Sequence, residues 1–140
     1  MVPTRSVLLM LAGALLLPGC MMGRPRPDAD TSPRRVSKAG QYEVRYEPSV
    51  QPVPKRALHT WTLHVHTRDG RPVDGAQLRI DGGMPDHGHG LPTRPRVREA
   101  LGNGTYVIEG MKFHMGGYWV VDVAIASAEG ADDVRFELNL

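Results

Sequence analysis

Residues 41–140 of this chain consist of short runs in which apolar and polar residues alternate, separated by turn-forming glycine and proline. Tyr42 and Val44 alternate with polar neighbours in one run, and Trp61 and Leu63 do so in another. No stretch of this region keeps the period of an amphipathic helix. Because successive side chains of a strand point to opposite faces, the alternation predicts half-buried β-strands. The region has the length of one ordinary domain with a single core.

Turn signals divide this region into about seven predicted strands. They are residues 41–47, 59–68, 76–80, 96–101, 105–109, 118–126 and 133–140. Asn103-Gly104 separates the fourth from the fifth, and this dipeptide favours a tight β-hairpin. Many short strands at such spacing are typical of two packed sheets. We therefore predict an all-β fold, an immunoglobulin-like antiparallel β-sandwich of about seven strands.

Residues 1–19 have the features of a bacterial signal peptide. Arg5 precedes an apolar run over residues 7–17, which has signal-peptide proportions and is short for a membrane span. The run ends in Leu17-Pro18-Gly19-Cys20, which resembles the lipobox of bacterial lipoproteins. The resemblance implies cleavage before Cys20 and attachment of lipid to it, and several acyl chains anchor a protein stably. We therefore predict a periplasmic protein that is bound to the membrane through a lipid anchor.

Residues 20–40 comprise the modified cysteine and a predicted flexible tether. Proline, glycine and charged residues dominate this segment and leave little to bury, so we expect no stable structure. A coil of this length reaches about 25 Å. Met21 directly after Cys20 matches the sorting pattern of outer-membrane lipoproteins. The folded domain is then predicted to begin at residue 41.

Composition and motifs argue against several classes of function. Cys20 is the only cysteine, so the predicted domain has no disulfide, no cysteine-based metal site and no thiol nucleophile. A formal net charge of +2 on an exported chain does not indicate a nucleic-acid partner. The sequence contains no Gly-x-Ser-x-Gly elbow, His-Glu-x-x-His motif, P-loop or dinucleotide fingerprint. We expect a protein that is not an enzyme.

Histidine and methionine gather in two glycine-flanked clusters. Met84, His87 and His89 lie in the first cluster, and His114 and Met115 lie in the second. Imidazole and thioether together suit copper, especially Cu(I), better than magnesium or calcium. The pattern indicates a copper site formed by the three histidines, with either Met84 or Met115 as a soft ligand.

Packing explains part of the same pattern. Met111, Phe113 and Met115 recur at period two, and large apolar residues in that pattern usually face a core. The sequence leaves open whether Met111 and Met115 are ligands or core residues. His87 and His89 could likewise stack on aromatic rings or bind loop carbonyls instead of a metal.

Three further residues near these patterns have simpler interpretations. His64 and His66 share a strand face with threonines, which fits a solvated surface better than a second metal site. Asp86 directly precedes His87 and could orient its imidazole through the second ring nitrogen.

Several short motifs of this region look familiar. Gly70-Arg-Pro-Val-Asp-Gly-Ala resembles a turn found in many secreted immunoglobulin-like and transthyretin-like modules. The later motifs are Met84-Pro-Asp-His-Gly-His-Gly-Leu-Pro, Gly104-Thr-Tyr, Gly110-Met-Lys-Phe-His-Met and Tyr118-Trp. In this order they resemble the YtkA-like family, a relative of FixH-type domains. The resemblance covers about Trp61 to Asp122. It implies an immunoglobulin-like sandwich in an exported, often lipid-anchored protein, and relatives suggest an association with copper handling and respiratory oxidases. Gly116-Gly117 replaces a proline that the family often has after the second cluster.

Two functions follow as expectations. The first is a lipid-anchored carrier or buffer of copper that passes the ion to a membrane or periplasmic protein. The second is an interaction module without metal, in which the two clustered loops dock onto a membrane or envelope protein complex.

Overall fold

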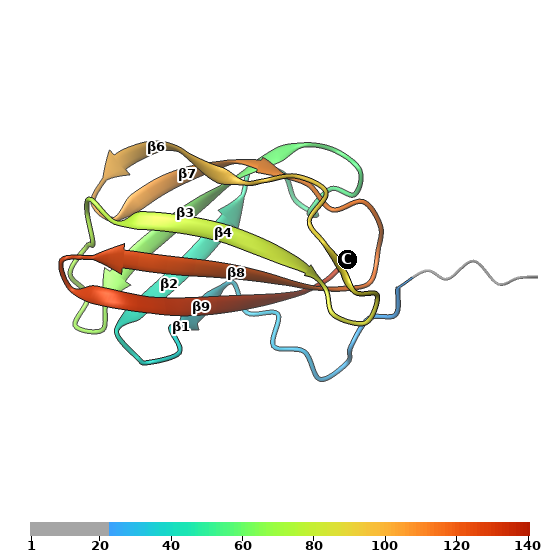
Figure 1. Ribbon diagram of the computed structural model, residues 1–140, viewed down its shortest axis with the longest axis horizontal. Helices are drawn as coiled ribbons and strands as arrows, with labels where there is room; N and C mark the ends of the chain where they lie inside the picture. The colour runs from blue at the N-terminus through green and yellow to red at the C-terminus, as the bar shows by residue number, and fades with distance from the viewer. Residues whose placement is uncertain (1–22) are drawn as a thin grey trace, which may run out of the picture.

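The computed structural model of the protein describes residues 23–140, which form nine β-strands in two antiparallel sheets packed face to face (Figure 1). The predicted all-β sandwich is therefore confirmed. The predicted signal peptide, the lipobox and Cys20 lie outside the described residues. Within residues 23–140, no helix has the length and apolar character needed to cross a bilayer.

The first sheet has five strands in the order β1-β2-β3-β7-β6. Their bounds are β1 Arg34–Val36, β2 Tyr42–Pro48, β3 His59–Thr67, β6 Arg96–Gly102 and β7 Thr105–Met111. Asn103 and Gly104 both have positive φ, 52° and 68°, in the turn between β6 and β7. This is the conformation that an Asn-Gly hairpin requires, so the predicted hairpin is confirmed.

The second sheet has four strands in the order β5-β4-β8-β9. Their bounds are β4 Gln77–Met84, β5 His89–Gly90, β8 Tyr118–Ser127 and β9 Gly130–Asn139. The long β8–β9 hairpin pairs continuously from Tyr118 opposite Asn139 to Ser127 opposite Gly130. The two-residue strand β5 pairs back onto the end of β4.

The core fills the space between the sheets with the alternating apolar residues. The first sheet contributes Tyr42, Val44, Trp61, Leu63, Val65, Tyr106 and Ile108, and the second contributes Ile80, Trp119, Val121, Val123, Val134, Phe136 and Leu138. Tyr46 stacks on Trp61 at 4.2 Å between centroids and meets Phe136 of the opposite sheet edge-on at 4.9 Å. Burial of each large aromatic side chain contributes about 2 kcal/mol, so these contacts join the sheets firmly.

All seven predicted strands are present, and two strands were not predicted. The core side of β3 alternates as expected, with Trp61 and Leu63 buried and His64 half-buried on the other face. β1 and β5 have three and two residues. Strands of that length show no period, and their pairing uses backbone groups that every residue carries, so the sequence contains no signal for them.

Residues 34–40, which composition assigned to a flexible tether, instead belong to the sandwich. β1 pairs with β2, and the Ser37 amide donates to the Tyr42 carbonyl at 2.9 Å. Ser37 also donates its hydroxyl to Asp132 Oδ2 at 2.6 Å. Asp132 lies close to Ser37 in space and far from it in sequence, which is why composition alone predicted disorder.

The preceding segment also follows the edge of β9. Arg26 and Asn139 form two hydrogen bonds. The Arg26 amide donates to Asn139 Oδ1 at 2.9 Å, and Asn139 Nδ2 donates to the Arg26 carbonyl at 2.8 Å. The Asp30 amide donates to Glu137 at 3.2 Å. From Gly23 onward the chain therefore lies along the second sheet before it reaches β1 (Figure 1).

Candidate metal site

The β4–β5 hairpin positions the first histidine pair. The Met84 carbonyl accepts hydrogen bonds from the amides of His87 and Gly88, both at 3.0 Å, and Gly88 adopts a φ of +67°. The chain thereby reverses within four residues, and His89 pairs with Met84 across the ladder. This turn, rather than an extended strand, brings the His87 and His89 rings to 5.6 Å between centroids.

The connection between β7 and β8 positions His114. Its neighbour Phe113 is buried, and the Phe113 carbonyl accepts a hydrogen bond from the Arg56 amide at 2.6 Å. Three residues after His114, Gly117 exchanges two backbone hydrogen bonds with Leu140, at 2.8 and 2.9 Å. The loop is thus fixed on both sides and holds His114 at the same end of the sandwich as the β4–β5 hairpin.

The three predicted histidines come together in a row at this end. His89 is the middle member, with its ring centroid 5.6 Å from that of His87 and 5.3 Å from that of His114. Two imidazoles that share one ion place their centroids about 5 Å apart, because each metal–nitrogen bond is about 2.0–2.1 Å. The spacing of each neighbouring pair in this histidine row therefore fits a shared ion.

His114 has an unpartnered nitrogen. Its Nδ1 atom is buried and has no hydrogen-bond partner among the described residues. The ring stands edge-on to the Trp119 ring at 5.2 Å with an interplanar angle of 87°, so the indole covers one side of it. A buried polar atom without a partner costs about 1–3 kcal/mol, and a bound ion is one way to recover that energy.

In the described part of the chain, no three His, Asp or Glu side chains already stand close enough to surround an ion. His87 and His114 each neighbour His89, but the three rings do not yet surround one point, so a site of three imidazoles requires side-chain rotation. His89 is exposed and His87 is half-buried, and neither ring forms a hydrogen bond with another residue of the range 23–140. The donor set therefore offers two imidazoles at a spacing that an ion can bridge, and a third after rotation.

A comparison with protein families identifies the relatives of this domain. The family model described as YtkA-like matches residues 34–124, which include all three members of the histidine row. The chain belongs to the YtkA-like family. No curated protein and no solved structure matches it significantly. The match begins at β1, so the domain boundary predicted at residue 41 lies too late, and the YtkA-like domain includes the first strand.

The methionines of this YtkA-like domain lie mainly in its core. Met84 and Met111 are 1% and 0% exposed, and Met115 packs against the core while partly exposed. The Met84 methyl group is covered by backbone, since a Cβ atom added at Gly23 or Gly117 would lie 2.6 or 2.9 Å from it. Met84 and Met111 thus act as packing residues in this conformation, and Met115 is the more accessible thioether.

Asp86 is oriented toward the N-terminal segment instead of the histidine that follows it. Its carboxylate forms an ion pair with Arg26 at 2.5 Å, and the Arg26 guanidinium lies 4.3 Å above the Tyr118 ring. Asp86 therefore fastens the N-terminal segment to the β4–β5 hairpin. Sequence reasoning missed this partner, because Arg26 lies 60 positions away in the predicted tether.

Two of the remaining histidines have structural partners. His59 is buried, accepts the Trp61 indole N–H at 3.2 Å, and lies 3.3 Å from the Ala57 carbonyl through Nδ1. Burial lowers the pKa of His59, and the contact with Ala57 opposes that shift. His64 lies 3.4 Å from Glu47 on the outer face of β3. The interpretation of that face as solvated is consistent with this contact.

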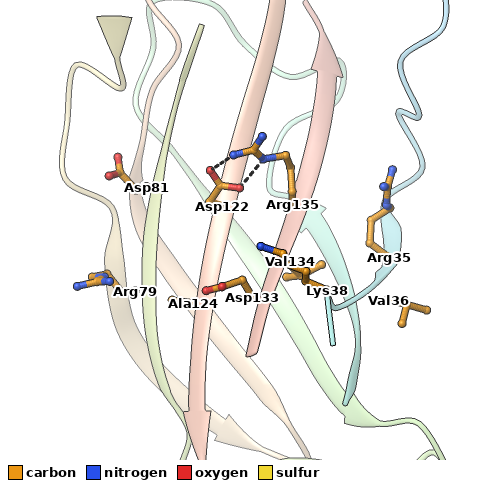
Figure 2. Close-up of a pocket in the computed structure, with 10 residues that line it drawn as sticks. All are labelled: Arg35, Val36, Lys38, Arg79, Asp81, Asp122, Ala124, Asp133, Val134 and Arg135. Carbon is orange, nitrogen blue, oxygen red and sulfur yellow. Dashed lines mark hydrogen bonds and ion pairs between the residues drawn. The ribbon is translucent and has the colours of Figure 1, made fainter. Parts of the chain in front are cut away.

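A broad hollow lies on the outer face of the four-stranded sheet, and no member of the histidine row lines it. It has a volume of about 790 Å³ and is bordered by the residues that Figure 2 labels. Both charges occur on its walls, and Asp122 and Arg135 pair there through two hydrogen bonds of 2.7 and 2.9 Å (Figure 2). Within residues 23–140 its lining contains no histidine or methionine, so this open groove has the character of a charged, solvated sheet face.

Proposed function

We propose that this YtkA-like protein is a periplasmic, lipid-anchored domain that binds copper and acts as a carrier or buffer of the ion. The histidine row is the binding site, and Cys20 carries the anchor, to the outer membrane. The carried ion would pass to a membrane or periplasmic protein. The observation that carries the proposal is the spacing of the three rings, 5.6 and 5.3 Å, next to an unpartnered buried nitrogen of His114.

The chemistry of the donors supports copper. Imidazole is a good ligand for copper in both oxidation states, and a thioether favours Cu(I). Met115 is the thioether best placed to join the row, because Met84 is covered by the backbone of Gly23 and Gly117. We therefore infer a site of two or three imidazoles with Met115 as the soft ligand, and Met84 as a residue that packs beneath it.

The test is a competition titration of the exported chain with a chromogenic Cu(I) chelator. We expect the protein to withdraw one equivalent of copper, and His89→Ala to weaken binding by about tenfold or more because His89 neighbours both other rings. His66→Ala is the matched control, since His66 lies on the outer face of β3. Thermal melts of each variant separate loss of the site from loss of the fold.

The methionines are tested in the same titration. Leucine has about the volume of methionine without its sulfur, so Met115→Leu removes a ligand while it conserves packing. We expect Met115→Leu to weaken Cu(I) binding and Met84→Leu to leave it unchanged. If the chelator binds the same amount of copper with and without protein, the copper proposal fails. Loss of a co-purifying partner in the histidine variants would then favour the interaction module.

A further inference from the structure

Basic side chains gather at one edge of the sandwich end that carries the histidine row. Arg96 and Arg98 lie at the start of the edge strand β6, and Arg94 lies just before it. All three line one shallow hollow together with Leu58. Leu58 is 67% exposed, the most exposed of the large apolar side chains in the described residues. Leu58 belongs to the β2–β3 connection, which also contains Lys55 and Arg56.

Most of these cations have no acidic partner. Arg96 pairs with Glu109 at 2.7 Å. In the part of the chain that the structure describes, Lys55, Arg56, Arg94 and Arg98 form no ion pair. The surface therefore presents several unneutralised cations around an exposed leucine. We call this set, consisting of Lys55, Arg56, Leu58, Arg94 and Arg98, the basic end.

The chain enters the domain beside the basic end. A Cβ atom added at Gly23 would lie 2.7 Å from the Gly116 carbonyl oxygen, so residue 23 packs on the Gly116–Gly117 turn. A Cβ atom added at Gly116 would lie 3.7 Å from Lys55 Cδ, so the same turn also contacts the basic end. In Figure 1 the entering chain and the β2–β3 connection lie at the same end of the molecule.

Gly23 lies only three positions after Cys20. Three extended residues span at most about 10 Å, which is far less than the reach of the longer tether that the sequence predicted. A lipid on Cys20 would therefore hold this end of the sandwich next to the bilayer.

We propose that the basic end lies on the membrane surface and contacts the head groups of anionic phospholipids. The proposal rests on the lipid anchor of the proposed function. Lys and Arg side chains are attracted by anionic head groups, and Leu58 enters the interface between them. Because Gly23 also covers Met84, which pairs with His89, this orientation brings the histidine row near the membrane.

Protection of a sheet edge accounts for only part of this pattern. Charged residues on an edge strand prevent pairing with another sheet, and β6 is an edge strand. That role fits Arg96 and Arg98. Edge protection does not explain why Arg56 lies in the neighbouring loop or why Leu58 is exposed. Contact with a lipid surface accounts for both residues.

The test places a fluorescent probe on the intact lipoprotein. Because Cys20 is the only cysteine and is consumed by lipidation, Leu58→Cys and Leu101→Cys each supply one free thiol. Leu101 is 55% exposed and lies near the other end of β6, so it is the matched control. The labelled proteins are reconstituted into phosphatidylcholine vesicles with and without phosphatidylglycerol, and quenching by brominated lipid is measured.

The anchor alone should quench the probe at position 58 somewhat more than the probe at 101 in both kinds of vesicle. We expect phosphatidylglycerol to increase the quenching at position 58 several-fold and to leave that at 101 nearly unchanged. High salt and the double variant Arg94→Gln/Arg98→Gln should abolish the increase that phosphatidylglycerol causes. Equal quenching at both positions, no effect of phosphatidylglycerol, or failure to float with either vesicle would overturn the proposal. Copper binding is measured on the same samples without vesicles, so failure of the copper site is scored separately.

Discussion

His114 stands edge-on to Trp119, with ring centroids 5.2 Å apart and planes at 87°. The other tryptophan, Trp61, is separated from this pair by Phe113, which lies 6.2 Å from Trp61 and 5.2 Å from Trp119 between centroids. An ion bound at the histidine row would therefore lie close to Trp119. The phenyl ring of Phe113 would stand between that ion and Trp61. This arrangement gives copper binding an optical signal within the native protein.

We expect copper to quench the fluorescence of Trp119 more strongly than that of Trp61. In Trp61→Phe most of the remaining emission should be lost on addition of one equivalent of copper, because Trp119 contacts His114 directly. In Trp119→Phe the emission should change little. Fluorescence titration measures both, with thermal melts to verify folding, and strong quenching in Trp119→Phe would argue against an ion at His114.

The buried His59 makes the stability of the fold depend on pH. Burial lowers its pKa below the ordinary value of 6.5, so the folded protein resists protonation that the unfolded chain accepts. Well above pH 6.5, where the ring is neutral in both states, this group contributes no pH dependence. Below that pH, stability falls by at most about 1.4 kcal/mol per pH unit until the lowered pKa is reached.

The variant His59→Gln tests this dependence. Glutamine keeps an acceptor for the Trp61 indole and removes the titratable ring. Urea unfolding between about pH 7 and pH 5 should show a smaller loss of stability in the variant than in the unmodified protein. Parallel curves for the two proteins would show that His59 is not the source.

Asp132 connects the segment before β2 to β9 and should govern stability in acid. Its carboxylate loses solvation through burial, but hydrogen bonds from Ser37 and from the amides of Ala39, Asp133 and Gln41 outweigh this and lower its pKa from 3.8 to about 2. The carboxylate therefore stabilises the fold above about pH 3.8, and this contribution is lost as the pH falls from 3.8 to about 2.

Replacement by asparagine removes the charge at this junction. Asp132→Asn should lower the free energy of unfolding at neutral pH by about 1 kcal/mol after solvent screening is allowed for. The variant should also lose less stability than the unmodified protein between about pH 4 and pH 2. Denaturant unfolding across that range measures both effects, and unchanged stability at neutral pH would contradict the role given to these hydrogen bonds.

Position 104 requires glycine for two reasons, its positive φ and the close approach of neighbouring backbone atoms. Its φ is +68°, and a Cβ atom there would lie 2.2 Å from the Val65 carbonyl oxygen and 3.0 Å from the Val73 amide nitrogen. Gly70 has a φ of +88°, but a Cβ atom added there would meet nothing within 4 Å beyond its chain neighbours. Gly104→Ala should destabilise by about 3 kcal/mol and Gly70→Ala by about 1 kcal/mol. Equal melting temperatures for the two variants would exclude the contact as a cause.

The sequence by itself determined the class of fold and the main strands. Trp61, Leu63 and Val65 alternate with polar residues, and that alternation has one low-energy solution, a strand with one face in a core. Asn103-Gly104 likewise determined a hairpin, because its backbone preference is local. The clusters around His87 and His114 were visible for the same reason, since they are short and contiguous.

Only the tertiary structure decided how these pieces meet. Three features depend on contacts between residues far apart in the chain. They are the ion pair of Arg26 with Asp86, the regular structure of residues 34–40 and the burial of Met84. No local pattern encodes such contacts, because backbone hydrogen bonds and packing accept many residue types. The same reason applies to the histidine row: spacing along the chain supplied the imidazoles, and the packing of two loops at one end of the sandwich brought neighbouring rings to 5.6 and 5.3 Å.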